Sequence, residues 1–464
     1  MLSQVARARM GMPIFTAPSM EYVPLIYTPF YYYVAAAVST VTGLSFFPLR
    51  IVSFLASLGL FVLMYKLARC ESGDRRTGVI AVSLFAATFV IGGSWLDIGR
   101  NDSLFLFMAI AGVYALRRSD TLKSAVVAGL CFAVAAMTKQ SALVIAAPLG
   151  LHLLLANWRR GLAFGVPLAL VFFGLAGIFD WVSDGWFGYY TIEIPRGHAL
   201  VPERFLGFWT DDMLGKFPIA TVGGLGYLAY RTVPRARRSG FLGALGAGLL
   251  AAAWSSRMHS GGIENVLIPG YFALSLCFAL GLGEGMVGGG ESRFAPYRPL
   301  ALCTAAGLQF LLLVYNPTAQ VPNSADREAG QALVRELATI DGPVWVPGQP
   351  YLAEVAGKPA YAHAVALQDI LRAGESPTKT ALARDLVGSI TERRFTALLL
   401  DGSFQDECPP RATVIDDVNW ICPEIQAAYR RERLLVLDPA AFEPVAGSPR
   451  RPVILYRALA GGRP

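Results

Sequence analysis

The segment Glu21-Tyr-Val-Pro-Leu-Ile-Tyr-Thr-Pro-Phe-Tyr-Tyr-Tyr33 combines several tyrosines with two prolines and one carboxylate. A tyrosine ring favours hydrocarbon and its hydroxyl favours water, so tyrosines gather at membrane interfaces. Pro24 and Pro29 lack an N–H and disfavour helix in the residue before each of them. We interpret the segment as a surface loop at the membrane face, followed by a helix from about Phe30 to Val41. A membrane span over the uncharged stretch Pro24–Leu49 is the alternative.

Composition around this segment is typical of a membrane protein. Of 464 residues, 54% are hydrophobic and 16% are charged, whereas soluble domains carry roughly 25% charge. Long uncharged runs concentrate in residues 48–316, and residues 317–464 have a soluble composition. We therefore expect an outer juxtamembrane segment (1–47), a transmembrane helical bundle (48–316) and a C-terminal domain (317–464). The net charge of +7 does not require a nucleic-acid partner, because Lys and Arg collect in cytoplasmic loops.

Uncharged runs predict about ten spans, although several are shorter than the roughly 20 residues of a straight span. The runs are 51–65, 78–96, 103–116, 124–138, 141–156, 161–179, 217–230, 239–256, 266–283 and 299–315. One set of alternate loops holds fifteen lysines and arginines, and the other holds six. The basic set is cytoplasmic by the positive-inside rule. In a plasma (inner) membrane, the Tyr27 loop and the C-terminal domain would then be extracytoplasmic.

The outer loops carry the candidate functional residues. Asp97, Arg100 and Asp102 lie together at one membrane face, where ionisable groups are functional candidates. Asp102 could instead be the N-cap of a helix from Ser103, and Asp97 could form a salt bridge with Arg100.

Two further outer loops carry cations. Lys139 precedes Gln140, and Arg257 and His259 precede Asn265. These cations either bind a lipid phosphate or anchor the chain at the interface. The four histidines show no metal-ligand spacing, so we assign no metal ligands and leave a divalent cation open.

The pattern after Asn316 predicts a small α/β domain, in which helices cover a sheet. The expected helices are Ala325–Ile340 and Thr380–Arg394, and the expected strands are Pro343–Val346, Thr396–Leu400 and Val453–Tyr456. Cys408 and Cys422 would both be extracytoplasmic, where oxidation is favoured, and we predict that they form a disulfide.

The order of short motifs resembles the GT-C superfamily of polyprenyl-phosphate-dependent glycosyltransferases. Its family-39-like branch, of protein mannosyltransferases and lipid A aminoarabinose transferases, is the most similar. The resemblance covers most of residues 1–316. The motifs are Tyr27-x-Pro-Phe-Tyr-Tyr32, Gly43, Pro48-Leu-Arg50, Gly99-Arg-Asn-Asp-Ser-Leu104 and Thr138-Lys-Gln-Ser-Ala142.

The resemblance implies a direct displacement. An acceptor hydroxyl of a glycan, lipid or protein attacks a sugar carried on polyprenyl phosphate at the outer face of the bilayer. The family has a first span and an acidic outer loop before the helix that Met1–Arg7 resembles, and we expect this sequence to lack both. The roles implied are catalytic for Asp102 and Asp97; donor-phosphate binding for Arg257, His259, Lys139 and Arg100; and pocket-forming for Glu21, Tyr27, Tyr31, Gln140 and Asn265.

Two other classes stay open on sequence alone. A transporter or flippase of lipid-linked saccharides needs a polar path, and the expected spans are almost free of charge. If the acidic loop is absent, the protein would be a non-catalytic scaffold.

Overall fold

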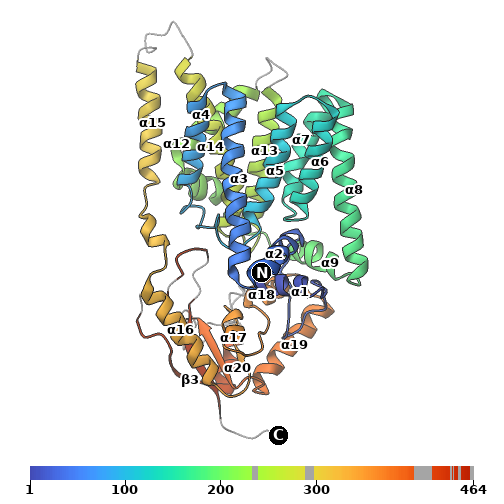
Figure 1. Cartoon of the computed structure of the whole chain (residues 1–464), viewed down its shortest axis with the longest axis vertical. Coiled ribbons are helices and arrows are strands. Elements are labelled where there is room, and N and C mark those ends of the chain that lie inside the picture. The colour runs from blue at the N-terminus through green and yellow to red at the C-terminus, as the bar shows by residue number, and fades with distance from the viewer. Residues whose placement is uncertain are drawn as a thin grey trace.

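A computed structural model describes residues 1–232, 239–287, 297–401, 421–438, 441–442, 444–447 and 451–459. A bundle of long helices forms one end of the molecule, and a small α/β domain forms the other (Figure 1). The N-terminus lies at the junction between them (Figure 1). The N-terminal segment, the helical bundle and the C-terminal domain, which are distant in sequence, therefore meet at this junction.

The first segment forms short helices and not one span. Helix α1 covers Leu2–Arg9, and α2 covers Phe30–Thr42, which is 13 residues and too short to cross a bilayer. Helix α2 ends at Thr42 and is followed by the C-cap residue Gly43, whose φ of +82° suits glycine. Ser45 then caps α3 by accepting a hydrogen bond from the Phe47 N–H. The expected helix is confirmed, and the alternative of a span over Pro24–Leu49 is wrong.

The bundle places α14 among α4, α12 and α13. Tyr271, Phe272 and Leu274 of α14 are fully buried there. The long helices are α3 (Phe46–Ser72), α4 (Arg75–Ala87), α5 (Asp102–Arg118), α6 (Leu122–Ala136), α7 (Ala142–Ala156), α8 (Trp158–Val182), α12 (Pro218–Thr232), α13 (Ser239–Met258), α14 (Ile268–Val287) and α15 (Arg298–Leu312). Short elements between them are α9 (Trp186–Gly188), η1 (Tyr189–Glu193), α10 (Ile194–Gly197), α11 (Glu203–Gly207), η2 (Phe208–Gly215) and η3 (Glu264–Leu267).

Three helices of the described chain are long and apolar enough to cross a membrane: Phe46–Ser72, Trp158–Val182 and Glu264–Met286. A fourth candidate joins Arg298–Leu312 to Pro317–Thr339 through a bend of 48°. Helices α6 and α7 are apolar but shorter. Length and composition therefore confirm fewer spans than the ten predicted, and that number stays a prediction.

The C-terminal domain contains a four-stranded sheet in the order β1-β2-β4-β3. Strand β1 (Val344–Trp345) is parallel to β2 (Ala397–Asp401), whereas β4 (Pro452–Ala458) is antiparallel to both β2 and β3 (Tyr429–Leu434). The helices of this part of the chain are η5 (Pro317–Gln320), α16 (Ser324–Thr339), α17 (Tyr351–Val355), α18 (Ala364–Arg372), α19 (Pro377–Thr391) and α20 (Cys422–Ala428). The three expected strands and two expected helices are present with shifted ends, and the sequence prediction lacked α18.

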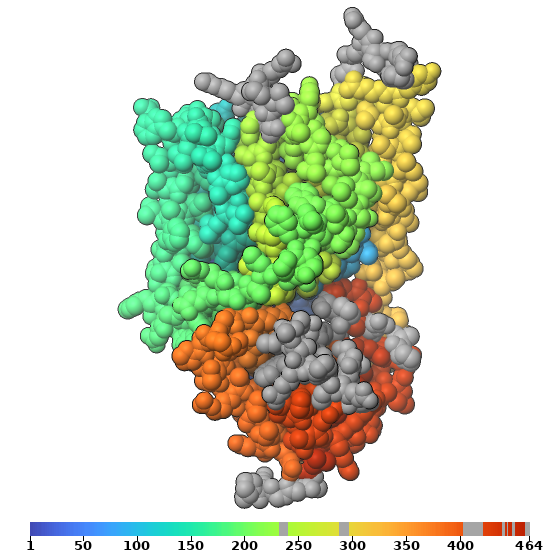
Figure 2. Space-filling view, turned by 180° about the vertical axis from the view of Figure 1, so that it is seen from behind, coloured from blue at the N-terminus to red at the C-terminus, as the bar shows by residue number. Residues whose placement is uncertain are grey.

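One hydrophobic core joins this domain to the N-terminal segment. Because side chains alternate along β2, Ala397 and Leu399 pack toward α16, while Leu398 and Leu400 face the other side. The core on that other side also contains Tyr31 of α2 and Ile370 of α18. Figure 2 shows this orange part of the domain directly against the green connections of the bundle. The domain is thus packed onto the loops at this end of the bundle.

Candidate active site

Asp102 is the centre of a buried polar network. It is the first residue of α5 and is 1% exposed. Its Oδ1 accepts hydrogen bonds from Lys139 Nζ at 2.6 Å and from Asn265 Nδ2 at 2.9 Å. Asn101, and not Asp102, is the N-cap, so the capping interpretation is wrong. The network joins α5, the α6–α7 loop and η3, and it brings together three side chains that were assigned separate roles from sequence.

Arg100 connects this network to the tyrosine-rich segment. Its Nε lies 3.6 Å from Asp102 Oδ2, and its Nη2 donates to the Tyr27 hydroxyl at 2.7 Å. The guanidinium also lies 4.9 Å from the Trp95 ring centre and 5.1 Å from that of Tyr27. Such cation–π contacts hold a charge in place without neutralising it. Arg100 therefore keeps a localised positive charge at the junction.

Backbone contacts fix the loop that carries these groups. Ser53 Oγ donates to the Arg100 carbonyl at 2.7 Å, and Asn101 Nδ2 donates to the Thr138 carbonyl at 2.8 Å. Tyr31 is fully buried, and its hydroxyl donates to the Leu49 carbonyl at 2.8 Å, next to Ser53 Oγ. Tyr31 thus contacts Leu49 and also Ser53, which holds the loop of Arg100 in place. The sequence prediction placed Tyr31 in the substrate pocket.

A cavity of about 280 Å³ lies beside the network. Gln140 is fixed at its edge, because Nε2 donates to the carbonyls of Ile26 at 2.8 Å and Thr191 at 3.1 Å. Four residues predicted from sequence therefore meet at one cavity. Its polar lining comprises Tyr27, Lys139, Gln140, Ser141, Thr191, Ser255, Ser256 and His259.

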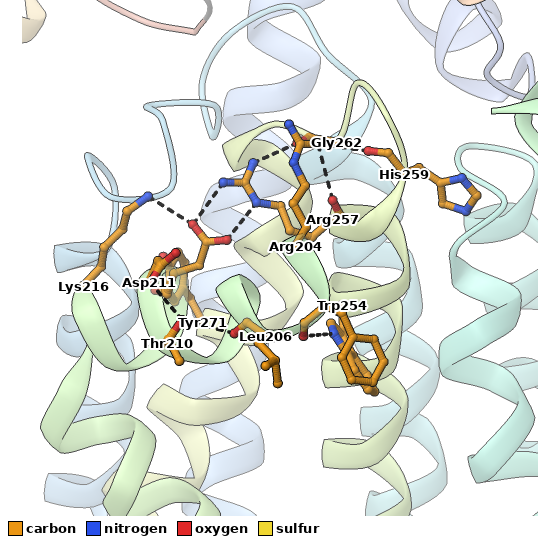
Figure 3. Close-up of polar contacts among 12 residues, drawn as sticks. Arg204, Leu206, Thr210, Asp211, Lys216, Trp254, Arg257, His259, Gly262 and Tyr271 are labelled. Carbon is orange, nitrogen blue, oxygen red and sulfur yellow. Dashed lines mark hydrogen bonds and ion pairs between the residues drawn. The ribbon is translucent and has the colours of Figure 1, made fainter. Parts of the chain in front are cut away.

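Arg257 lies in a second network, shown in Figure 3. Its Nε and Nη2 donate to the two oxygens of Asp212 at 2.7 and 3.1 Å, and its Nη1 donates to the Gly262 carbonyl at 2.8 Å. Lys216 Nζ also lies 3.2 Å from Asp212 Oδ1. Three of the five guanidinium donors are thus used inside the protein. These hydrogen bonds indicate that Arg257 fixes the 257–262 loop.

Arg204 stabilises the same loop from a different element. Its Nη1 lies 3.0 Å from both the His259 and Gly262 carbonyl oxygens. The His259 ring points away from this network (Figure 3), and its Nδ1 has no hydrogen-bond partner within the described residues. The sequence prediction did not include Asp212 or Arg204. Their only sequence signal was their position between the uncharged runs 161–179 and 217–230.

Two predicted residues lie apart from the cavity lining. Asp97 Oδ2 pairs with Arg50 Nη2 at 2.7 Å in an exposed ion pair, so the alternative of a salt bridge to Arg100 is wrong. Glu21 pairs with Arg394 of the C-terminal domain, and this hydrogen bond lowers the pKa of the Glu21 carboxyl. Glu21 therefore joins the two parts of the molecule.

Two further predictions concern a disulfide and a metal site. Cys422 is buried at the start of α20, and Cys408 lies outside the described residues, so their pairing stays a prediction. Within the described ranges, no group of three or more His, Cys, Asp and Glu side chains could hold a metal ion.

Comparisons with known proteins bear on the fold. Residues 24–183 match the family described as dolichyl-phosphate-mannose-protein mannosyltransferase. A comparison with curated protein sequences finds no match. ArnT from Cupriavidus metallidurans bound to undecaprenyl phosphate has a similar structure, with a TM-score of 0.55 and 12% identity over 98% of this chain and 92% of that one.

A second solved structure has the same arrangement at lower coverage. The oligosaccharyltransferase AglB from Archaeoglobus fulgidus, in complex with an inhibitory peptide and a dolichol-phosphate, has a TM-score of 0.51 and 13% identity. The match covers 86% of this chain and 64% of that one. The sequence resemblance is thus confirmed, and the protein has the fold of GT-C glycosyltransferases.

Proposed function

We propose that this protein is a membrane glycosyltransferase. It moves a sugar from a polyprenyl-phosphate donor to an acceptor hydroxyl at the outer face of the plasma (inner) membrane. The observation that carries the proposal is the cavity in which Lys139, His259, Tyr27 and Gln140 meet beside the buried Asp102 network. The family match over residues 24–183 includes three of these four residues.

The donor phosphate would lie against Lys139 and His259. The Lys139 ammonium has three donors, of which Asp102 uses one, and the other two have no acceptor among the described residues and could bind phosphate oxygens. Cations at this position stabilise the charge that grows on the leaving phosphate in the transition state. Asp102 fixes the ammonium, and Arg257 supports the loop of His259. Tyr27 and Gln140 would contact the sugar.

Binding and transfer by the full chain test the proposal. Purified protein in nanodiscs is titrated with undecaprenyl phosphate, and release of this lipid from undecaprenyl-phosphate-linked pentoses and hexoses is measured with and without EDTA. We expect binding by the wild type and at least ~10-fold weaker binding by Lys139→Ala, equivalent to about 1.4 kcal/mol. Lys123→Ala is the matched control, because Lys123 is exposed at the opposite end of α6.

Each result separates the alternatives. A wild type that binds no polyprenyl phosphate contradicts the proposal. A wild type that binds the lipid but transfers none of the sugars offered favours the non-catalytic scaffold. EDTA-sensitive transfer assigns a divalent cation to the reaction.

A further inference from the structure

Residues 20–28, which we call the linking segment, form part of the cavity wall. Ile26 and Tyr27 of this segment line the cavity. Gln140 Nε2 donates to the Ile26 carbonyl at 2.8 Å, and Arg100 Nη2 donates to the Tyr27 hydroxyl at 2.7 Å. All residues of the segment are described, and none lies in a helix or strand. Because no regular backbone pairing fixes its shape, its path depends on what holds its two ends.

The helical bundle holds the end of the linking segment that follows Tyr27. Thr28 is 1% exposed, and its Oγ1 donates to the Ala136 carbonyl at 2.8 Å. The Phe30 N–H then donates to the Met137 carbonyl at 2.9 Å. Both acceptors lie at the end of α6, just before Lys139. This end of the segment is therefore fixed beside the loop that carries the cation of the cavity.

The C-terminal domain holds the other end. The Met20 N–H donates to Asp385 Oδ2 of α19 at 3.1 Å, and the Met20 carbonyl accepts from the Ala362 N–H at 2.8 Å. The Glu21 carboxylate pairs with Arg394 just after α19. Met20 is fully buried, so loss of its partner would leave a buried polar group unsatisfied, which is costly. Three polar contacts from the domain thus reach two consecutive residues of the segment.

The same domain also contacts a second part of the cavity lining. Pro195 of α10 lines the cavity, and the chain just after it meets α18. His198 Nε2 lies 2.8 Å from the Asp369 carbonyl oxygen. A Cβ at Gly197 would lie 3.0 Å from the Gly374 nitrogen, so the two backbones are in close contact. The domain therefore holds two separate segments that form the cavity.

We propose that the C-terminal domain positions the sugar side of the cavity, with Arg394 and Asp385 as positioning residues that act through the linking segment. The inference rests on the proposed function, in which Lys139 and His259 hold the donor phosphate and Tyr27 contacts the sugar. Neither phosphate-binding residue belongs to the linking segment. A displaced segment would therefore misplace the sugar and slow its transfer, while the phosphate is still bound.

Charge reversal in the full chain tests the pair of Glu21 and Arg394. Each of Glu21→Arg and Arg394→Glu places like charges against each other, and the double variant restores an opposite pair. We expect each single variant to lose at least ~5-fold in transfer rate, and the double variant to stay within about twofold of wild type. Undecaprenyl phosphate binding and Tm should match wild type in all three. Arg433→Glu is the control, because Arg433 forms a similarly exposed pair with Glu336 inside the same domain.

The contact between Asp385 and Met20 gives a second test. Asp385→Ala removes the acceptor of the buried Met20 N–H, whereas Asp385→Asn keeps a side-chain oxygen at this position. We expect Asp385→Ala to lose at least ~5-fold in transfer rate and Asp385→Asn to be near wild type. Hydrogen exchange reports on the segment independently of activity. It should become faster in residues 20–28 for Asp385→Ala and stay unchanged for Asp385→Asn.

The outcomes separate this inference from the proposed function. Smaller losses of transfer in the single charge variants and in Asp385→Ala overturn the inference alone, and so does a double charge variant that recovers no activity. A loss of undecaprenyl phosphate binding equal to the loss of transfer also overturns it, because Arg394 would then support the whole site. A wild type without lipid binding overturns the proposed function, and the inference with it.

Discussion

Arg257 donates two hydrogen bonds to the Asp212 carboxylate, from Nε to Oδ2 at 2.7 Å and from Nη2 to Oδ1 at 3.1 Å. The Asp212 and Arg257 side chains are 6% and 15% exposed, so the pair is largely withdrawn from water. A two-point contact of this kind uses the planar fork of arginine, which lysine lacks. The pair joins η2 to the end of α13 and fixes the loop that carries His259.

Arg257→Lys should keep expression but lose at least ~10-fold in transfer rate, equivalent to about 1.4 kcal/mol. A lysine can make only a point contact with Asp212, so the 257–262 loop should become less fixed. The rate is measured with lipid-linked donor. Arg118→Lys is the control, because Arg118 is exposed at the end of α5 away from the cavity.

Asp212→Asn distinguishes the two roles of Arg257. If Arg257 acts by fixing the loop, this variant should lose a similar factor, because one partner of the fork is removed. If Arg257 binds phosphate itself, the variant frees the guanidinium, and donor binding should be kept or improved. Wild-type rates in both variants would leave Arg257 as an interface anchor.

Sequence reasoning could place residues on one face of the membrane, and this was enough to gather Asp102, Lys139 and Asn265. Loops at one end of a helical bundle must meet, so sidedness predicts proximity. Sidedness does not predict which charged side chains form ion pairs, because that depends on how the helices pack. Asp97 pairs with Arg50 on the neighbouring helix and not with the nearby Arg100.

The remaining discrepancies have the same origin. Tyr31 turns inward because its phase on α2 faces α3, which the tyrosine composition does not reveal. Helix α18 was missed because nothing in its sequence indicates that it contacts the loop segment around His198. The number of spans stays a prediction, since uncharged runs do not fix where helices begin and end.

The orientation gives a topology prediction. The excess of Lys and Arg in one set of alternate loops places them in the cytoplasm. A reporter active only outside the cytoplasm should be active when fused to the C-terminus and silent when fused after Asp120, between α5 and α6. The reverse pattern would reject the orientation and the outer-face site with it.

Cys408 and Cys422 should form a disulfide. Closing the loop between them stabilises by about 3 kcal/mol in the chain-entropy model. Cys70, Cys131, Cys277 and Cys303 are free thiols in the structure and provide the internal reference. Labelling of the oxidised, unfolded protein should modify these four and spare the other two until a reductant is added. Labelling of all six without reductant contradicts the pairing.

The stability of the protein should depend on the ionisation of Asp369. Its pKa is about 7 in the folded protein and near 3.8 when unfolded, so the folded state binds the proton more tightly. This contribution is fully present below about pH 4 and is lost as pH rises toward 7. An asparagine at this position cannot ionise, so Asp369→Asn avoids this loss of folding stability, which is on the order of a few kcal/mol. Its Tm should therefore exceed that of wild type above pH 7 and approach it near pH 4. A lower Tm for the variant above pH 7 would mean that the carboxylate has a stabilising partner.

Asp102 and Lys139 should behave as a coupled buried pair. Asp102→Asn leaves the Lys139 ammonium and the Arg100 guanidinium without their carboxylate, and breaking such a pair typically costs about 3–5 kcal/mol. Adding Lys139→Met removes one of the stranded charges, so the double variant should regain part of the Tm lost by Asp102→Asn. Transfer should stay abolished in both, because the cation for the phosphate is displaced in one and absent in the other.

The exposed pair of Asp97 and Arg50 is the matched control for this cycle. It also joins an acid of the same loop to a cation, but its side chains are 35% and 53% exposed. Surface pairs contribute about 0–1 kcal/mol, because water solvates the partner that is left. Asp97→Asn should therefore change Tm little and keep transfer. If Asp97→Asn loses as much stability and activity as Asp102→Asn, burial does not separate the two acids. Additive Tm changes for Asp102→Asn and Lys139→Met would show that the 2.6 Å contact carries no coupling, and Lys139 would then act on the phosphate independently of Asp102.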